Sequence, residues 1–153
     1  TASVEAGAGP TPFGFSGPVY LTGPYNGAPY GLSIAVPAVA GPFNLGVVVT
    51  RATINIDPYT ARVTATATLP RVVKGVLVRF QHISVAVNKQ GFLLTPTNCG
   101  ALATESTLSG YTPGSGATAT VNLSTPFSVG ECGKLAFKPS FKVKTSAKTS
   151  NGN

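Results

Sequence analysis

The sequence predicts an all-β fold, and within that class an antiparallel β-sandwich of immunoglobulin-like or jelly-roll-like type. Several short segments alternate apolar and polar residues, which is the pattern of half-buried strands. Glycine and proline, at 18 and 13 of the 153 residues, mark turns between these segments. No segment shows a helical period with capping residues. Short strands separated by frequent turns favour a sandwich over a closed barrel.

The clearest strands lie in the middle of the chain. Residues 48–56 place apolar side chains on one face and polar ones, including Arg51, on the other. The turn at 57–60 follows, in which Pro58 presets φ and Asp57 can accept hydrogen bonds from the backbone. Residues 61–69 then alternate in the same way. We predict a two-strand hairpin with its polar face toward solvent.

Two further segments read as strands with irregularities. Residues 32–36 alternate, and Pro37 moves the end of this strand toward a sheet edge, because proline cannot donate to the ladder. Residues 75–88 are also extended, but the phase of their alternation changes near Gln81 and His82. One extra residue reverses the faces of a strand, so we predict a β-bulge at this point.

The C-terminal third of the chain alternates in two places. Residues 117–123 form one predicted strand and residues 135–144 form a last one. In the last strand, apolar residues alternate with lysines at 138, 142 and 144, so the lysines would line its outer face. The best helical candidate is residues 101–108, which would form a turn or two.

The domain boundaries follow from composition. Residues 1–18 are rich in Gly, Ala and Pro and are interpreted as a flexible linker. Residues 19–145 form the predicted sandwich domain, and residues 146–153 form a frayed polar tail. The chain contains no methionine, so we interpret it as a processed or excised piece of a longer protein. No apolar run reaches the roughly 18 residues of a membrane span.

Acidic residues are unusually scarce, and this argues against catalysis. The chain has four carboxylate side chains and one histidine, His82. Asp57 has a structural role in its turn, and His82 has no predicted nucleophile or acidic partner. Glu105 and Glu131 would suit a glycosidase-like pair, but nothing else in the region supports one. We therefore expect no enzyme activity, no metal site and no cofactor.

The net charge of +7 raises the question of a nucleic-acid partner. The basic residues are scattered over the middle of the chain and then concentrated near its C-terminus. The excess arises as much from missing acids as from added bases, and no nucleic-acid motif accompanies it. We expect no nucleic-acid partner.

The two cysteines, Cys99 and Cys132, have two interpretations. They can form one disulfide, or they can be reactive thiols or metal ligands. Two thiols with one distant histidine make a poor zinc site, and no C-x-x-C motif is present. We predict the disulfide, which indicates an oxidising compartment. Closing a loop of about 30 residues would stabilise the fold by about 3–4 kcal/mol.

The tyrosines are the remaining candidates for a binding site. Tyr20, Tyr25 and Tyr30, with Tyr59 and Tyr111, can form a flat surface on which sugars stack. The alternative is that the rings cover the ends of the sandwich with their hydroxyls bound to the backbone. A carbohydrate site predicts several tyrosines exposed on one face, whereas the alternative predicts buried rings.

A long string of residues resembles a known kind of module. It runs from Gly23 to Gly46 and continues through Ile56-Asp57-Pro58, Gly91-Phe92, Asn98-Cys99 and the stretch 129–132. This string is similar to an uncharacterised module of large secreted or surface proteins of actinobacteria, over most of residues 20–141. The resemblance implies an extracellular piece of a multidomain protein with paired cysteines, and it supplies no catalytic residues.

The resulting functional hypothesis is a non-catalytic structural or adhesion module of a secreted or cell-surface bacterial protein. Its partners would be other domains of the same parent chain, or a surface glycan or protein. The alternative hypothesis is a carbohydrate-binding module that uses exposed tyrosines.

Overall fold

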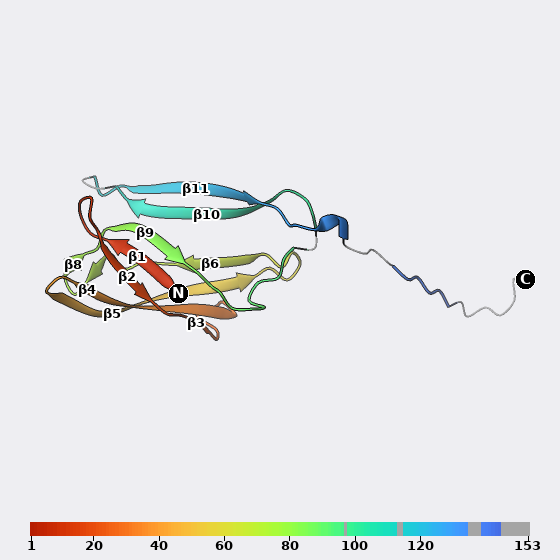
Figure 1. Cartoon of the computed structure of the whole chain (residues 1–153), viewed down its shortest axis with the longest axis horizontal. Helices are drawn as coiled ribbons and strands as arrows, with labels where there is room; N and C mark the ends of the chain where they lie inside the picture. The colour runs from red at the N-terminus through yellow and green to blue at the C-terminus, as the bar shows by residue number, and fades with distance from the viewer. Residues whose placement is uncertain (97, 113–114, 135–138, 145–153) are drawn as a thin grey trace, which may run out of the picture. The chain divides into compact units, whose positions relative to one another are not determined.

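The computed structural model describes residues 1–96, 98–112, 115–134 and 139–144, apart from the Cys132 side chain. The described residues form antiparallel strands and one short 3-10 helix, so the predicted all-β class is confirmed (Figure 1). The chain divides into two compact units, residues 1–92 and 93–153, which we call unit 1 and unit 2. The predicted single domain over 19–145 is therefore divided at Phe92.

Unit 1 contains three antiparallel sheets, with strand orders β2-β1-β9, β3-β4-β5-β6 and β7-β8. Its strands are β1 (Ala2–Ala6), β2 (Phe13–Gly17), β3 (Val19–Thr22), β4 (Tyr30–Ala40), β5 (Phe43–Ile56), β6 (Val63–Ala67), β7 (Val72–Val73), β8 (Val76–Leu77) and β9 (Phe80–Val85). The two long strands, β4 and β5, run side by side along the unit (Figure 1).

The predicted flexible linker over residues 1–18 is wrong, because this segment forms β1 and β2. Ala2 and Ala6 of β1 are buried, whereas Glu5 faces solvent. The cause is long-range pairing: β1 pairs with β2 on one side and with the distant β9 on the other. Ala and Gly have weak strand propensity, so the local sequence carries little sign of this pairing.

Gly17 and Pro18 take the chain from one sheet of unit 1 to the next. Gly17 ends β2, and Pro18 leads directly into β3 at the edge of the β3-β4-β5-β6 sheet. The Ala35 amide donates to the Pro18 carbonyl at 3.1 Å. A Cβ on Gly17 would overlap the Ala35 carbonyl and lie 2.9 Å from the Val36 Cα. Only glycine lets the two strands cross at this separation.

The core of unit 1 is small and sits on one face of the β3-β4-β5-β6 sheet. Leu32, Ala52 and Ile54 are buried together, and Val19 and Phe92 pack against them. The alternation predicted for residues 48–56 is confirmed at these positions, because Ala52 and Ile54 are buried while Arg51 is exposed. The hairpin predicted for residues 48–69 is also confirmed, as β5 pairs with β6.

The predicted bulge in β9 is confirmed at Gln81. Glu5 pairs with His82 and Ala6 pairs with Phe80, so Gln81 is the extra residue. The Gln81 Nε2 atom donates to the carbonyls of Gly7 at 3.0 Å and Gly9 at 2.9 Å. The bulge thus turns a side chain toward the loop between β1 and β2 and binds it there.

Unit 2 contains one hairpin of two strands, β10 (Leu102–Tyr111) and β11 (Thr118–Phe127), followed by the 3-10 helix η1 (Cys132–Lys134). The strand predicted for 117–123 is confirmed, but the helical candidate at 101–108 is wrong, because β10 occupies it. Polar cross-strand pairs stabilise β10 as a strand. Thr107 donates to Asn122 at 2.8 Å, and Ser124 donates to Glu105 at 2.7 Å.

The two faces of this hairpin differ in chemistry. One face carries the polar pairs, and the register places apolar residues on the other. These apolar residues are Leu102, Leu108, Val121, Leu123 and Phe127. Leu108, Val121 and Leu123 are more than half exposed, at 56%, 54% and 52%. No residue in the described part of unit 2 is buried. An isolated two-strand hairpin is only marginally stable in water, so its apolar face must pack against other residues to be stable.

The end of the chain differs from the prediction. Residues 139–144 have no regular secondary structure, so the last predicted strand is not formed there, and 135–138 lie outside the described residues. Without a pairing partner, alternation does not by itself make a strand. The predicted tail, 146–153, also lies outside the description.

Candidate functional site

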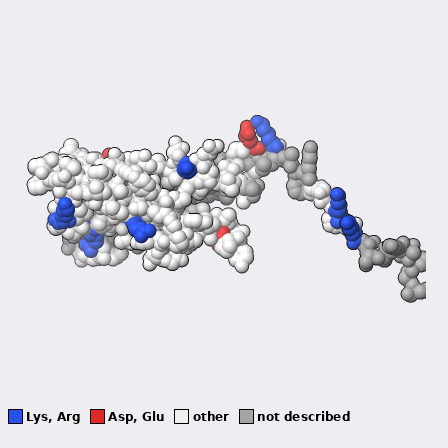
Figure 2. All heavy atoms as spheres, turned by 90° about the horizontal axis from the view of Figure 1, so that it is seen from below, with Lys and Arg blue, Asp and Glu red and all other residues white. Residues whose placement is uncertain are grey.

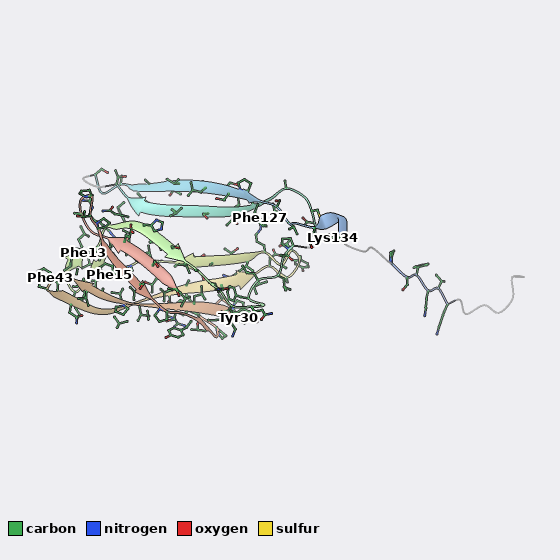
Figure 3. The ribbon with its side chains drawn as sticks, in the orientation of Figure 1. Phe13, Phe15, Tyr30, Phe43, Phe127 and Lys134 are labelled. Carbon is green, nitrogen blue, oxygen red and sulfur yellow. The ribbon has the colours of Figure 1, made fainter. Side chains whose placement is uncertain are left out.

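The three predicted stacking tyrosines do not share one face. Tyr20 pairs with Ser33 in the β3–β4 ladder, whereas Tyr30 pairs with Ile54 in the β4–β5 ladder. Ser33 and Tyr30 are three residues apart in β4, so they lie on opposite faces. Both tyrosines are exposed, Tyr20 at 56% and Tyr30 at 46%. In Figure 3, Tyr30 lies at the opposite end of unit 1 from Phe13 and Phe43. Tyr30 therefore belongs to the face that carries the core.

Tyr25 reaches the sheet from a tight turn between β3 and β4. Tyr25 and Ala28 exchange backbone hydrogen bonds of 3.1 and 3.0 Å. Asn26 and Gly27, between them, have φ values of 47° and 80°. These are the backbone angles of a two-residue hairpin turn, for which Asn-Gly is the favoured sequence. The predicted Asn26-Gly27 turn is thus confirmed, and it directs Tyr25 back over the sheet.

Tyr25 packs closely against the backbone of Gly31 in β4. A Cβ at Gly31 would come within 3.0 Å of the Tyr25 Cβ and 2.8 Å of the Thr22 Oγ1. Gly31 is buried although it lies on the polar face of the sheet. The missing side chain lets Tyr25 approach the backbone of β4.

Arg51 lies on the same face and stacks on Tyr25. The Arg51 Cζ atom is 3.7 Å from the centroid of the Tyr25 ring. This is a cation–π contact, in which the guanidinium lies over the negative face of the ring. Such a contact holds a long side chain in place while its N–H groups stay available at the edge of the plane.

A row of side chains crosses the sheet at this point. Tyr20 pairs with Ser33, and Ser33 pairs with Arg51, so the three lie side by side on one face of β3, β4 and β5. We call the surface formed by Tyr20, Tyr25, Ser33 and Arg51 the tyrosine–arginine face. Neighbouring strands lie about 4.8 Å apart, so Tyr20 and Arg51 are about 10 Å apart at the backbone. Ser33, between them, has a short side chain and is partly buried.

The basic residues elsewhere form no single dense patch on the face that Figure 2 shows. Lysine and arginine atoms appear there at separate places, with few acidic atoms. This distribution is consistent with the scatter of basic residues in the sequence. The tyrosine–arginine face therefore differs from a basic nucleic-acid surface, because it combines one arginine with aromatic rings.

The candidate acids are each engaged locally. The Asp57 carboxylate accepts hydrogen bonds from the Tyr59 and Thr60 amides at 2.9 and 2.8 Å, which confirms its role in the turn. These backbone hydrogen bonds lower the pKa of Asp57. In unit 2, Glu105 accepts from Ser124 and Glu131 pairs with Lys134 at 2.8 Å. None of these contacts resembles an acid–base pair.

His82 has an acidic neighbour that the sequence did not predict. Glu5, placed by sequence in a linker, lies opposite His82 in the β1–β9 ladder. Both side chains are exposed. Among the described residues, no three His, Cys, Asp or Glu side chains gather as a metal site would require. Within the same residues, no helix is long and apolar enough to cross a membrane.

The predicted disulfide falls partly outside the description, since the Cys132 side chain is not described. Cys132 begins η1, and Glu131 before it adopts a φ of 61°. No cysteine of the described part is a free thiol. The pairing of Cys99 with Cys132 stays a prediction.

The residues around the candidate site that the sequence did not single out are Arg51, Ser33 and Gly31. Alternation correctly placed Arg51 on the solvent face, but it gave no sign of its contact with Tyr25. The sequence feature that could have indicated this contact is the Asn26-Gly27 pair. It forms a two-residue turn that brings Tyr25 back over the sheet. The pairing of β3 with β4 was needed to place Tyr20 next to Ser33.

Comparisons with family models, with curated proteins and with solved structures find no match to this chain. Its function is therefore argued from its own residues.

Proposed function

We propose that this chain is a non-catalytic structural or adhesion module of a secreted or cell-surface bacterial protein. The observation that carries this proposal is the local engagement of three of the four acids. Asp57 binds its own turn, Glu105 binds Ser124 and Glu131 pairs with Lys134. Carboxylates used in this way are not positioned for acid–base chemistry.

The proposed architecture is an antiparallel β-sandwich with one disulfide. The alternation in β5 and the two-faced β10–β11 hairpin support it, because each presents one apolar face that must be covered. A disulfide between Cys99 and Cys132 would suit an extracellular module. The resemblance to modules of secreted actinobacterial proteins supports the same location.

The proposal is tested with a panel of esterase, glycosidase and phosphatase substrates. We expect no turnover above buffer for the wild-type protein. Turnover that is lost in Glu105→Gln or Glu131→Gln, while both variants keep the wild-type circular dichroism spectrum, would overturn the non-catalytic proposal. Ser106→Ala, a substitution at an exposed hydroxyl of β10, is the matched control.

A second candidate function is carbohydrate binding, and a specific observation favours it. Tyr20 is 56% exposed and lies on the same face as Arg51. Exposed aromatic rings are favourable surfaces for the apolar face of a sugar. Affinity electrophoresis in gels that contain soluble polysaccharides tests this function. We expect retardation of the wild-type chain and its loss in Tyr20→Ala; equal mobility in every gel would contradict it.

A further inference from the structure

Arg51 carries a charge that its surroundings leave available. Among the described residues it has no carboxylate partner, and its one described side-chain contact is the Tyr25 ring at 3.7 Å. The described acids of unit 1 are Glu5 in β1 and Asp57 in the β5–β6 turn, which binds its own backbone. Arginine has five N–H donors in a planar fork, and a stacked ring uses none of them.

The stack also fixes where this fork lies. A free arginine side chain loses rotamer entropy when it is ordered, so a prepositioned one binds an anion at lower entropic cost. Tyr25 is itself held by the Asn26-Gly27 turn and by its approach to Gly31. The positioning residue for Arg51 is therefore Tyr25, whose ring is already occupied by the guanidinium.

Tyr20 supplies the second part of the surface. This residue is 56% exposed and lies in the same row as Arg51, with Ser33 between them on β4. The exposed ring can stack against the C–H face of a pyranose, while the Ser33 hydroxyl can donate or accept a hydrogen bond. A ligand that stacks on Tyr20 and extends past Ser33 would then contact the Arg51 guanidinium at its other end.

We propose that the tyrosine–arginine face binds a saccharide that carries a carboxylate group, such as a hexuronate residue. The pyranose ring stacks on Tyr20, and its carboxylate accepts two parallel hydrogen bonds from the Arg51 guanidinium. Paired N–H donors match the two oxygens of a carboxylate in geometry and charge. This inference rests on the second candidate function, carbohydrate binding, and specifies its ligand class.

The row of residues favours an acidic sugar over a general polyanion. The basic residues are dispersed, so the net charge of +7 gives a weak, salt-sensitive attraction for any polyanion. That attraction does not involve Tyr20 or Tyr25. The proposed site requires a sugar ring and a carboxylate in the same molecule. This requirement distinguishes an acidic saccharide from a general polyanion.

The test measures binding by isothermal titration calorimetry with three probes at 150 mM salt. They are a galacturonate tetrasaccharide, a galactose tetrasaccharide and poly-L-glutamate at the same carboxylate concentration. We expect the galacturonate probe to bind about tenfold or more tightly than the neutral one, since hydrogen bonds to charged groups are strong. Poly-L-glutamate, which has carboxylates but no sugar ring, should bind more weakly than the galacturonate probe.

Variants identify the residues responsible. Arg51→Gln and Arg51→Lys should both remove the preference for the acidic sugar, because lysine keeps the charge but not the planar fork. Arg79→Gln removes an exposed arginine from the connection between β8 and β9 and should keep the preference. Tyr25→Ala should remove the preference, and Tyr25→Phe should retain it, because the phenylalanine ring preserves the stack. Unfolding midpoints measured on each variant show that it is folded.

The outcomes separate this inference from the function on which it rests. Equal binding of the neutral and acidic tetrasaccharides would overturn the inference and leave carbohydrate binding standing. Binding of neither saccharide would overturn both. Poly-L-glutamate bound as tightly as the galacturonate probe, or a preference unchanged in Arg51→Gln, would overturn the inference in favour of general charge attraction.

Discussion

The Arg51 guanidinium lies on the Tyr25 ring, with its Cζ atom 3.7 Å from the ring centroid. The two residues come from different elements, the β3–β4 turn and strand β5. Their contact depends on Gly31, because a Cβ there would crowd the Tyr25 Cβ at 3.0 Å. The stack is thus a tertiary contact that a backbone feature of β4 makes possible.

Gly31→Ala should break this stack. The new Cβ would lie 2.8 Å from the Thr22 Oγ1 and 3.0 Å from the Tyr25 Cβ, so Tyr25 must move. We expect a loss of about 1–3 kcal/mol in the free energy of unfolding, as is typical of overpacking. The NMR signals of the Arg51 side chain should lose the ring-current shift that Tyr25 causes. Gly23→Ala, which meets no atom within 4 Å, is the control.

Gly17→Ala should be more damaging. Its Cβ would overlap the Ala35 carbonyl and approach the Val36 Cα to 2.9 Å, and backbone atoms cannot move aside as a side chain can. We expect destabilisation of about 3 kcal/mol or more in urea unfolding. Gly14→Ala in the same strand meets nothing within 4 Å and should unfold at or above the wild-type midpoint. Equal midpoints for the two variants would contradict the close crossing at Gly17.

Asp57 should make stability depend on pH. Its carboxylate accepts backbone hydrogen bonds from Thr60 and Tyr59, which lower its pKa below the unfolded value of about 3.9. A lowered pKa gives stability that is fully present above the unfolded value and is lost as pH falls through the folded value. Asp57→Asn keeps an acceptor oxygen but cannot titrate. The wild-type advantage over this variant should shrink between about pH 5 and pH 2.

Urea unfolding of both proteins across this range measures that difference. Thr60→Val is a useful companion, because it keeps the backbone amide that binds Asp57 and removes only the side-chain hydroxyl. It should retain most of the pH dependence. A difference between wild type and Asp57→Asn that stays constant from neutral to acidic pH would contradict the role of the carboxylate charge.

Gln81→Ala should loosen the loop between β1 and β2. The variant loses the hydrogen bonds to the Gly7 and Gly9 carbonyls, which are exposed, so we expect a cost of about 1 kcal/mol. Gln81→Glu should cost at least as much, because a carboxylate cannot donate to a carbonyl. Limited proteolysis of residues 7–12 measures the loosening. Gln90→Ala, at an exposed position, is the control, and the protease should cleave residues 7–12 of this variant at the wild-type rate.

The Cys99–Cys132 disulfide should be visible in the intact mass. Reduction of one bridge adds about two hydrogen masses, because it restores two thiols. Reduced protein, or the Cys99→Ser and Cys132→Ser double variant, should lose about 3–4 kcal/mol in the free energy of unfolding. An unchanged mass after reduction would show free thiols and would weaken the proposed secreted location.

Local patterns were sufficient for much of the fold. The period-two alternation located β5 and β6, the Asn26-Gly27 pair located a turn, and the phase change located the bulge at Gln81. Each of these depends on residues that are close in sequence. Backbone angles and side-chain alternation act within a few residues, so they leave a readable signal.

The same patterns failed where pairing is long-range. The segment 1–18 looked like a linker, because its Ala and Gly residues have little strand propensity, yet β1 is held between β2 and β9. The segment 135–144 alternated well, yet residues 139–144 form no strand. In both cases the presence or absence of a partner strand outweighs local propensity.

The sequence by itself determined the all-β class and the solvent face of β5. Only the tertiary structure decided that Tyr20 and Tyr30 lie on opposite faces and that Tyr25 carries Arg51. The reason is register: a shift of one residue between strands moves a side chain to the other face. Register depends on contacts between strands, and these exist only once the chain has folded.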